Sequence, residues 1–292
     1  MASDDVVAED AGKPPGSPGP RPLVRSADGR LRRRLAAIDL DGTLLRPDGT
    51  LSERSRTALD GARSAGIRIV LVTARGPRSV RLLGAELGLE GSAICSNGAI
   101  TLDLGSGAIL RRQPLASEVA ARLVRELRSR LPGILFAAES EEFALEPGFA
   151  AWEWEPPPGT RYADAVELVA EPVAKLIVRH ETHALEAIAE AARELAGSDA
   201  AVTIPGPWTV VISAAGVSKA VALEELCDEL GVGAAEVVAF GDYTNDLPML
   251  KWAGHAVAVA NAHPDVLRVA DEVTASNVDD GVAAVLERLA AG

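Results

Sequence analysis

The sequence predicts an α/β protein built on a doubly wound parallel sheet, with a separate α+β unit inserted in the middle of the chain. The sheet is predicted because short apolar runs, of the kind that are buried on both faces, alternate with helix-like segments. This alternation occupies residues 34–112 and resumes near 213. The inserted unit is predicted because residues 113–212 break that alternation.

The first half of the sheet domain follows a regular order along the chain. Strand, helix, strand, helix and strand are expected over residues 34–39, 52–65, 67–73, 77–88 and 92–95. Pro77 suits the first turn of its helix, because its fixed φ is helical and its missing N–H is not needed there.

The second half is predicted from an amphipathic helix and the segments that follow it. Leu223, Leu226, Cys227 and Leu230 recur with the i, i+3, i+4, i+7 spacing of one helical face within 218–231. Strands are then expected at 236–240, 255–260 and 271–276. A helix is expected from about 244, and another between the last two strands.

The chain therefore divides into three parts. Residues 1–32 are rich in Pro and Gly and predict a disordered tail. Residues 33–112 and 213–292 form the expected sheet domain, and 113–212 the inserted unit, with helical stretches at 117–130 and 183–196.

Composition excludes several classes of partner. The net charge of −13 disfavours nucleic acid, which is normally bound by a basic surplus. No apolar run approaches the roughly 18 residues of a membrane span, and the acidic N-terminus lacks a signal sequence. Cys95 and Cys227 lie in apolar surroundings and are expected to be buried, reduced thiols, which suits a cytoplasmic protein.

Polar residues collect where the predicted strands end. Asp39 and Asp41 follow the first strand, Thr73 ends the second, and Ser96-Asn97 follow the third. The segment "GDYTND" after a later strand adds three more side chains, and a lysine begins the preceding helix; these residues are Asp242, Asn245, Asp246 and Lys219. Because ligands of open parallel sheets bind outside the carboxyl ends of the strands, we expect these side chains to share one edge.

The chemistry of this edge points to a phosphate ester and a metal ion. Converging carboxylates repel one another, and a hard cation such as Mg²⁺ relieves that repulsion. A hydroxyl, an amide and an ammonium group suit phosphoryl oxygens. Of two carboxylates spaced i and i+2, one can attack phosphorus and the other can exchange a proton with the leaving oxygen.

The ordered motifs resemble those of the haloacid dehalogenase superfamily, and its Cof-type phosphatases (subclass IIB) in particular. The resemblance rests on "DLDGT" (39–43), Thr73, "SNGA" (96–99), "GVSKAVAL" (216–223), "GDYTND" (241–246), "NAHPDV" (261–266) and "ADEVTASNVDDGVA" (270–283). It implies a Rossmann-like core with a large α+β cap that selects the substrate, and it covers about residues 34–292.

The resemblance also implies a role for each residue. Asp39 would be the nucleophile and Asp41 the acid/base. Mg²⁺ would be held by Asp39, by the backbone carbonyl of Asp41 and by Asp242. Phosphoryl oxygens would be bound by Thr73, Lys219 and Asn245, while Asp246 would orient Lys219 or a metal-bound water. Position 243 is Tyr, whereas Asn or Ser is commoner there in the family. This difference concerns the shape of the rim of the site.

The expected function is Mg²⁺-dependent hydrolysis of small phosphate monoesters, such as sugar or related metabolite phosphates, through an aspartyl-phosphate. A phosphomutase of the same superfamily and a non-catalytic phosphate-binding protein are the alternatives. Trp152, Trp154 and Tyr162 could stack on a substrate ring or form the core of the inserted unit. The oligomeric state and the physiological substrate are not predicted.

Overall fold

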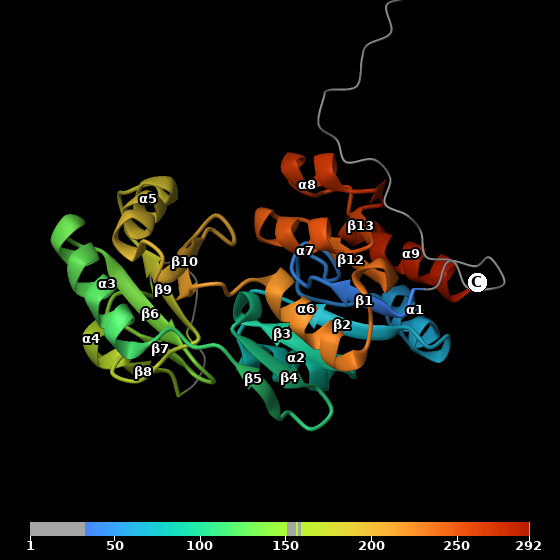
Figure 1. The fold of residues 1–292 in the computed structure, drawn as a ribbon, viewed down its shortest axis with the longest axis horizontal. Helices are drawn as coiled ribbons and strands as arrows, with labels where there is room; N and C mark the ends of the chain where they lie inside the picture. The colour runs from blue at the N-terminus through green and yellow to red at the C-terminus, as the bar shows by residue number, and fades with distance from the viewer. Residues whose placement is uncertain (1–32, 151–155, 157–158, 292) are drawn as a thin grey trace, which may run out of the picture.

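The computed structural model describes residues 33–150, 156 and 159–291. Figure 1 shows them as two lobes that lie side by side, joined by the segments that follow β5 and β11. The tail expected at 1–32 and the side chains of Trp152 and Trp154 lie outside the described residues.

The larger lobe contains an eight-stranded sheet in the order β14-β13-β12-β1-β2-β3-β4-β5. Its strands are β1 (Leu35–Ile38), β2 (Arg68–Val72), β3 (Ser92–Cys95), β4 (Ile100–Asp103), β5 (Ile109–Arg112), β12 (Val237–Gly241), β13 (His255–Ala258) and β14 (Glu272–Val273). The strands from β14 to β3 are parallel, which confirms the predicted fold class.

The pair β4 and β5 is antiparallel and extends the sheet beyond β3. This pair was not predicted. Antiparallel neighbours need only a short turn between them, so no helix separates these strands and the alternation used above does not detect them.

Helices cover the large sheet, and all but the last of them lie close to where they were expected. They are α1 (Glu53–Ser64), α2 (Pro77–Leu87), α6 (Lys219–Leu230), α7 (Leu247–Trp252), α8 (Pro264–Val269) and α9 (Gly281–Ala290). Ser52 caps α1 by accepting from the backbone N–H of Ser55, and Pro77 occupies the first turn of α2. Helix α1 packs against α9, and α6 packs against α7.

The smaller lobe contains a six-stranded, mainly antiparallel sheet in the order β10-β11-β9-β6-β7-β8. Its elements are α3 (Ser117–Arg130), β6 (Leu135–Glu139), β7 (Phe143–Leu145), β8 (Arg161–Tyr162), α4 (Ala165–Leu168), β9 (Lys175–Arg179), α5 (Leu185–Ala196), β10 (Ala200–Thr203) and β11 (Val210–Ala214). This mixed sheet with its helices is the α+β unit that the sequence predicted.

Separate apolar clusters fill the two lobes. Residues of β1, β2, β3 and β12 dominate one cluster, and residues of α3, β6, β9 and α5 dominate another. Both Cys95 and Cys227 are free and buried in the first cluster. The division at 113 and 212 stays a prediction, and because 212 falls within β11, a break after Ala214 would keep that strand whole.

The order of the strands determines which polar residues meet. Strand β1 lies between β2 and β12, with Ile38 in register with Leu71 on one side and Phe240 on the other. The residues that follow these three strands therefore emerge together at one edge of the sheet.

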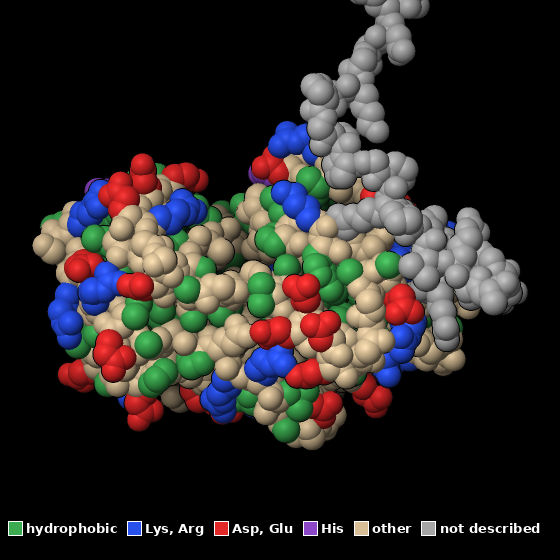
Figure 2. Space-filling view, viewed as in Figure 1, with side chains coloured by type: hydrophobic (Ala, Val, Ile, Leu, Met, Phe, Trp, Pro, Cys, Tyr) green, Lys and Arg blue, Asp and Glu red, His purple; other side chains and the backbone are tan. Residues whose placement is uncertain are grey.

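The surface that faces the viewer in Figure 2 carries acidic and basic side chains interspersed over both lobes. The negative net charge is thus not gathered into one patch on that face. Among the described residues, no helix has both the length and the apolar character required to cross a bilayer.

Candidate active site

Asp39 lies immediately after β1 at the centre of the site. Its backbone N–H donates to the carbonyl of Phe240 on the neighbouring strand, at 3.1 Å, which fixes the direction in which the chain leaves the sheet. The carboxylate is buried, and its Oδ1 accepts a hydrogen bond from Lys219 Nζ at 2.6 Å. Burial raises the pKa of Asp39 well above its usual range, against the opposing effect of Lys219.

Lys219 is the first residue of α6 and is 1% exposed. The side chain of Ser218 caps this helix by accepting from the backbone N–H of Val221, so the start of the helix is well defined. Lys219 Nζ also donates to Asp246 Oδ1 at 2.6 Å. Burial favours the neutral amine, but the carboxylates of Asp246 and Asp39 outweigh it and raise the pKa of Lys219.

Asp246 has hydrogen-bond partners on both carboxylate oxygens. Besides the bond from Lys219, its Oδ2 accepts from the backbone N–H groups of Asp242 and Tyr243, each at 3.1 Å. Asp246 therefore ties the loop after β12 to the lysine. This geometry suits the orienting role that the family resemblance implies for Asp246.

Asp242 faces the turn that follows Asp39. Its Oδ1 accepts from Thr43 Oγ1 at 2.8 Å. Gly42 has φ +82°, and a Cβ there would lie 2.4 Å from Asp242 Oδ2, so only glycine fits both the backbone angle and the space. Burial, followed by repulsion from Asp246, raises the pKa of Asp242 to about 6.

The carboxylates of Asp39, Asp242 and Asp246 each place an oxygen within 4.8 Å of the others. One ammonium group cannot neutralise three carboxylates, so repulsion between them adds to burial in raising the pKa values of Asp39 and Asp242. Hard oxygen donors in this arrangement fit Mg²⁺. The expected metal ligands were Asp39, Asp41 and Asp242; the structure brings the first and third together, with Asp246 as their neighbour.

The side chain of Asp41 does not join this acidic group. It is 54% exposed and accepts two hydrogen bonds from Arg75, at 2.8 Å from Nε and 2.6 Å from Nη2. Strand β1 ends at Ile38, so Asp41 lies beyond the strand, where it forms an isolated β-bridge with Leu45. Leu40 between the two aspartates is fully buried.

Thr73 and Asn245 lie on either side of Asn97. The backbone N–H of Asn97 donates to the Thr73 carbonyl at 3.0 Å, and Asn97 Oδ1 accepts from Asn245 Nδ2 at 3.1 Å. Asn97 Nδ2 is buried without a hydrogen-bond partner among the described residues. A buried donor of this kind is suited to an oxygen of a bound ligand.

Three residues of the site were missed by the sequence analysis or left without a role. Arg75 donates hydrogen bonds to Asp41, and Thr43 donates one to Asp242. Asn97 accepts one from Asn245. Arg75 could have been found, because it is a charged residue placed two positions after Thr73 at a strand end. Thr43 and Asn97 were quoted within motifs, but their partners are distant in sequence.

The rim of the site contains the residue that departs from the family pattern. The Tyr243 ring meets the His263 ring edge-on, with centroids 5.7 Å apart. Next to His263, Asn261 Nδ2 donates to the Gly42 carbonyl at 2.8 Å. The segment "NAHPDV" thus supports the turn after β1 from the far end of the chain.

Comparison with known proteins identifies the family. The model of the haloacid dehalogenase-like hydrolases matches residues 36–286. The 5-amino-6-(5-phospho-D-ribitylamino)uracil phosphatase YitU of Bacillus subtilis is 30% identical, over 87% of this chain and 96% of its own. The pyridoxal phosphate phosphatase YbhA of Escherichia coli is 29% identical, over 86% of this chain and 96% of its own.

A solved structure agrees with these relatives. A haloacid dehalogenase-like hydrolase from Bacteroides thetaiotaomicron superimposes with a TM-score of 0.75 at 27% identity, covering 88% of this chain and 99% of its own. The chain belongs to the haloacid dehalogenase-like hydrolases and is a phosphatase of their Cof-type branch, subclass IIB.

Proposed function

We propose that this protein hydrolyses small phosphate monoesters in a Mg²⁺-dependent reaction that passes through an aspartyl-phosphate on Asp39. The observation that carries the proposal is the placement of Asp39. Its buried carboxylate is held by Lys219 beside Asp242, and Asp41 lies two residues away on the solvent side.

In the first step, a carboxylate oxygen of Asp39 attacks phosphorus, and the bond from phosphorus to the ester oxygen breaks. Asp41 in its protonated form gives its proton to that leaving oxygen. In the second step, Asp41 takes a proton from water, whose oxygen attacks the same phosphorus. Inorganic phosphate then leaves, and the Asp39 carboxylate is restored.

The remaining residues of the site bind the phosphoryl group and the metal. Thr73, Lys219 and Asn245 would donate hydrogen bonds to its oxygens. Asp39, Asp242 and the backbone carbonyl of Asp41 would hold Mg²⁺, which when bound neutralises charge on the phosphoryl oxygens.

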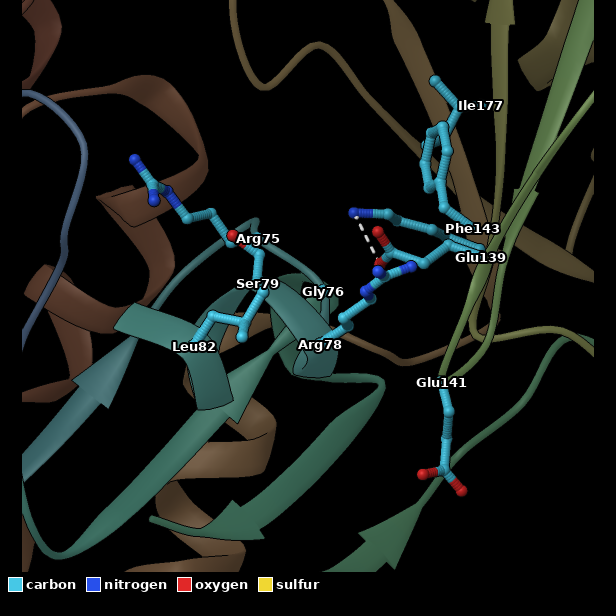
Figure 3. Close-up of a pocket in the computed structure, with 10 residues that line it drawn as sticks. Arg75, Gly76, Arg78, Ser79, Leu82, Glu139, Glu141, Phe143 and Ile177 are labelled. Atoms are coloured by element: carbon cyan, nitrogen blue, oxygen red, sulfur yellow. Dashed lines mark ion pairs between the residues drawn. The ribbon is translucent and has the colours of Figure 1, made fainter. Parts of the chain in front are cut away.

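A cavity between the lobes offers space for the rest of the substrate. Its volume is about 340 Å³, near the lower end of the range for ligand pockets, which favours a small metabolite. In Figure 3, Arg75, Gly76 and Leu82 form one wall, while Glu139, Phe143 and Ile177 form the other. Arg75 and Glu139 are both in ion pairs, so the charge of Arg75 is already neutralised. The walls therefore suit a polar group of the substrate rather than a second phosphate.

The substrates named for the relatives fit such a cavity. YitU and YbhA are named for phosphate esters that carry a single nitrogen-containing ring. We propose a substrate of that size class. A panel of sugar phosphates, nucleotides and cofactor phosphates, with pyridoxal phosphate included, would rank the candidates by kcat/KM.

Hydrolysis of an aryl phosphate with and without Mg²⁺ tests the proposed reaction. We expect turnover that requires the metal, and a loss of turnover in Asp39→Asn because the nucleophile is removed. Turnover near the wild-type rate in Asp39→Asn would contradict the assigned nucleophile. Absence of metal-dependent turnover at high enzyme concentration would favour a phosphate-binding protein.

A further inference from the structure

A buried ion pair of the smaller lobe reaches into the catalytic lobe. Glu139 ends β6 and Lys175 begins β9, and the two residues are direct partners across the sheet. Their exposed fractions are 8% and 5%, and Lys175 Nζ lies 3.0 Å from Glu139 Oε1. We call these two residues the docking pair; Figure 3 marks their contact with a dashed line.

The docking pair holds the backbone that follows β2. Lys175 Nζ donates to the carbonyl of Ala74 at 2.7 Å. The Glu139 carboxylate lies against Gly76, where a Cβ would come within 2.3 Å of it. The residues on both sides of Arg75 are therefore fixed from the other lobe.

Glu139 also holds the loop that follows β3. Ser96 Oγ donates to Glu139 Oε1 at 2.7 Å, and the backbone N–H of Ser96 donates to the Arg75 carbonyl at 2.8 Å. Ser96 has φ +51°, which is unfavourable for a serine. Such a conformation is maintained only when the surrounding contacts stabilise it, and the hydrogen bond to Glu139 is one of those contacts.

Stability alone does not account for this arrangement. Removing two charges from water costs free energy that the attraction within a buried pair often fails to repay, and apolar replacements are frequently neutral. The pair instead positions the backbone around Arg75, because each contact described above is made to a residue that adjoins Arg75 or is hydrogen-bonded to it. Arg75 in turn makes two hydrogen bonds to Asp41.

We propose that Glu139 and Lys175 are positioning residues for Asp41, acting through residues 74–76 and the guanidinium of Arg75. Asp41 is then held in place when the two lobes are docked, so proton transfer to the leaving group depends on the smaller lobe. This inference rests on the proposed function, in which Asp41 is the acid/base.

Two variants disturb the docking pair in different ways. Glu139→Gln removes its charge while keeping its size. Gly76→Ala keeps both charged residues but places a methyl group where the Glu139 carboxylate lies. Gly76 has φ −76° and ψ 164°, a conformation that alanine adopts without strain, so Gly76→Ala is expected to fold.

The readout is kcat/KM for an alkyl phosphate compared with an aryl phosphate. An alkyl oxygen is a poor leaving group that needs a proton, whereas an aryl oxygen leaves with little help. We expect both variants to lose on the order of 10–100-fold on the alkyl ester, since a small misplacement of a catalytic group can cost about 100-fold. The loss on the aryl ester should be several times smaller.

A matched control is Glu146→Gln. Glu146 is also 8% exposed, pairs with Arg128 and contacts the backbone N–H of Phe136, all within the smaller lobe. Its substitution should lower the melting temperature without changing the ratio of the two kcat/KM values. Hydrogen exchange at Arg75 and Ser96 should accelerate in Glu139→Gln and Gly76→Ala but not in the control.

The outcomes separate the two proposals. An active wild type whose alkyl-to-aryl ratio is unchanged in both variants would overturn the positioning role and leave the proposed function intact. Equal losses on both esters would also overturn it, since they indicate a general structural effect. A wild type without metal-dependent turnover would refute the proposed function, and the role of the docking pair with it.

Discussion

At the scale of single residues, the two aspartates of "DLDGT" lie in different environments. Asp39 is buried among charged groups, whereas Asp41 is more than half exposed and held by Arg75. A nucleophile gains from a rigid, dry position, and an acid/base must exchange protons with water between steps. The burial of Asp39 and the exposure of Asp41 therefore fit the roles proposed for the two carboxylates.

Asp41→Asn should lower kcat/KM for an alkyl phosphate by about 10²–10⁴-fold, the usual contribution of general acid–base catalysis. Asparagine has nearly the same shape but cannot supply the proton. Steady-state kinetics on alkyl and aryl esters would measure the effect, with the larger loss on the alkyl ester. An unchanged rate on that ester would remove Asp41 from the mechanism.

At the scale of elements, short turns at strand ends place the functional groups. The turn after β1 brings Gly42 and Thr43 against Asp242, and the start of α6 brings Lys219 to Asp39. The sheet supplies only the position of each strand end. The direction of each side chain is set by the few residues that follow it.

Gly42→Ala should reduce both stability and Mg²⁺ affinity. The positive φ costs roughly 1–2 kcal/mol for a residue with a Cβ, and the added methyl group would displace the Asp242 carboxylate. Gly49→Ala is the matched control, since Gly49 has φ +78° but no atom within 4 Å of the added Cβ. Chemical denaturation and calorimetric Mg²⁺ titration of both variants would separate strain from displacement.

Equal Mg²⁺ affinities in Gly42→Ala and Gly49→Ala would show that the methyl group leaves the Asp242 carboxylate in place. The close approach at position 42 would then have no part in metal binding.

At the scale of the whole molecule, the site is assembled from distant parts of the chain. Asp39 and Lys219 are 180 positions apart, and Lys175 and Ala74 are 101 apart. The two lobes both contribute: one supplies the groups proposed to react, and the other contacts the backbone around Arg75. The same few contacts therefore link folding to the proposed metal binding and catalysis.

Mg²⁺ should raise the melting temperature of the wild-type protein, because a ligand that binds only the folded state stabilises it by about 2.7 kcal/mol at 100 times its Kd. Asp242→Asn should abolish this shift. Without the metal, the same variant should melt at a higher temperature than the wild type, since it removes one of three crowded carboxylates. Differential scanning calorimetry with and without Mg²⁺ would measure both effects.

Asp103→Asn serves as the control for this experiment, because Asp103 binds Ser106 in a turn outside the site. Its Mg²⁺-induced shift should equal that of the wild type. A full shift in Asp242→Asn would exclude Asp242 as a metal ligand.

The sequence by itself determined the parallel sheet, the inserted unit and most of the residues that gather at the site. It could do so because the signals are local: apolar runs mark buried strands, and the carboxyl ends of parallel strands share an edge. The grouping of Asp39, Asp242, Asp246 and Lys219 follows from that rule. In the structure, Lys219 donates to Asp39 and Asp246, and oxygens of the three carboxylates lie within 4.8 Å of one another.

Only the tertiary structure decided the contacts between segments that no periodic pattern relates. Arg75 and Asp41 are 34 positions apart, and Ser96 and Glu139 are 43 apart on different lobes. No role was assigned to Glu139 or Lys175 from the sequence. They are buried because the two lobes pack against each other at that point, and the partner of a buried charge depends on packing in space.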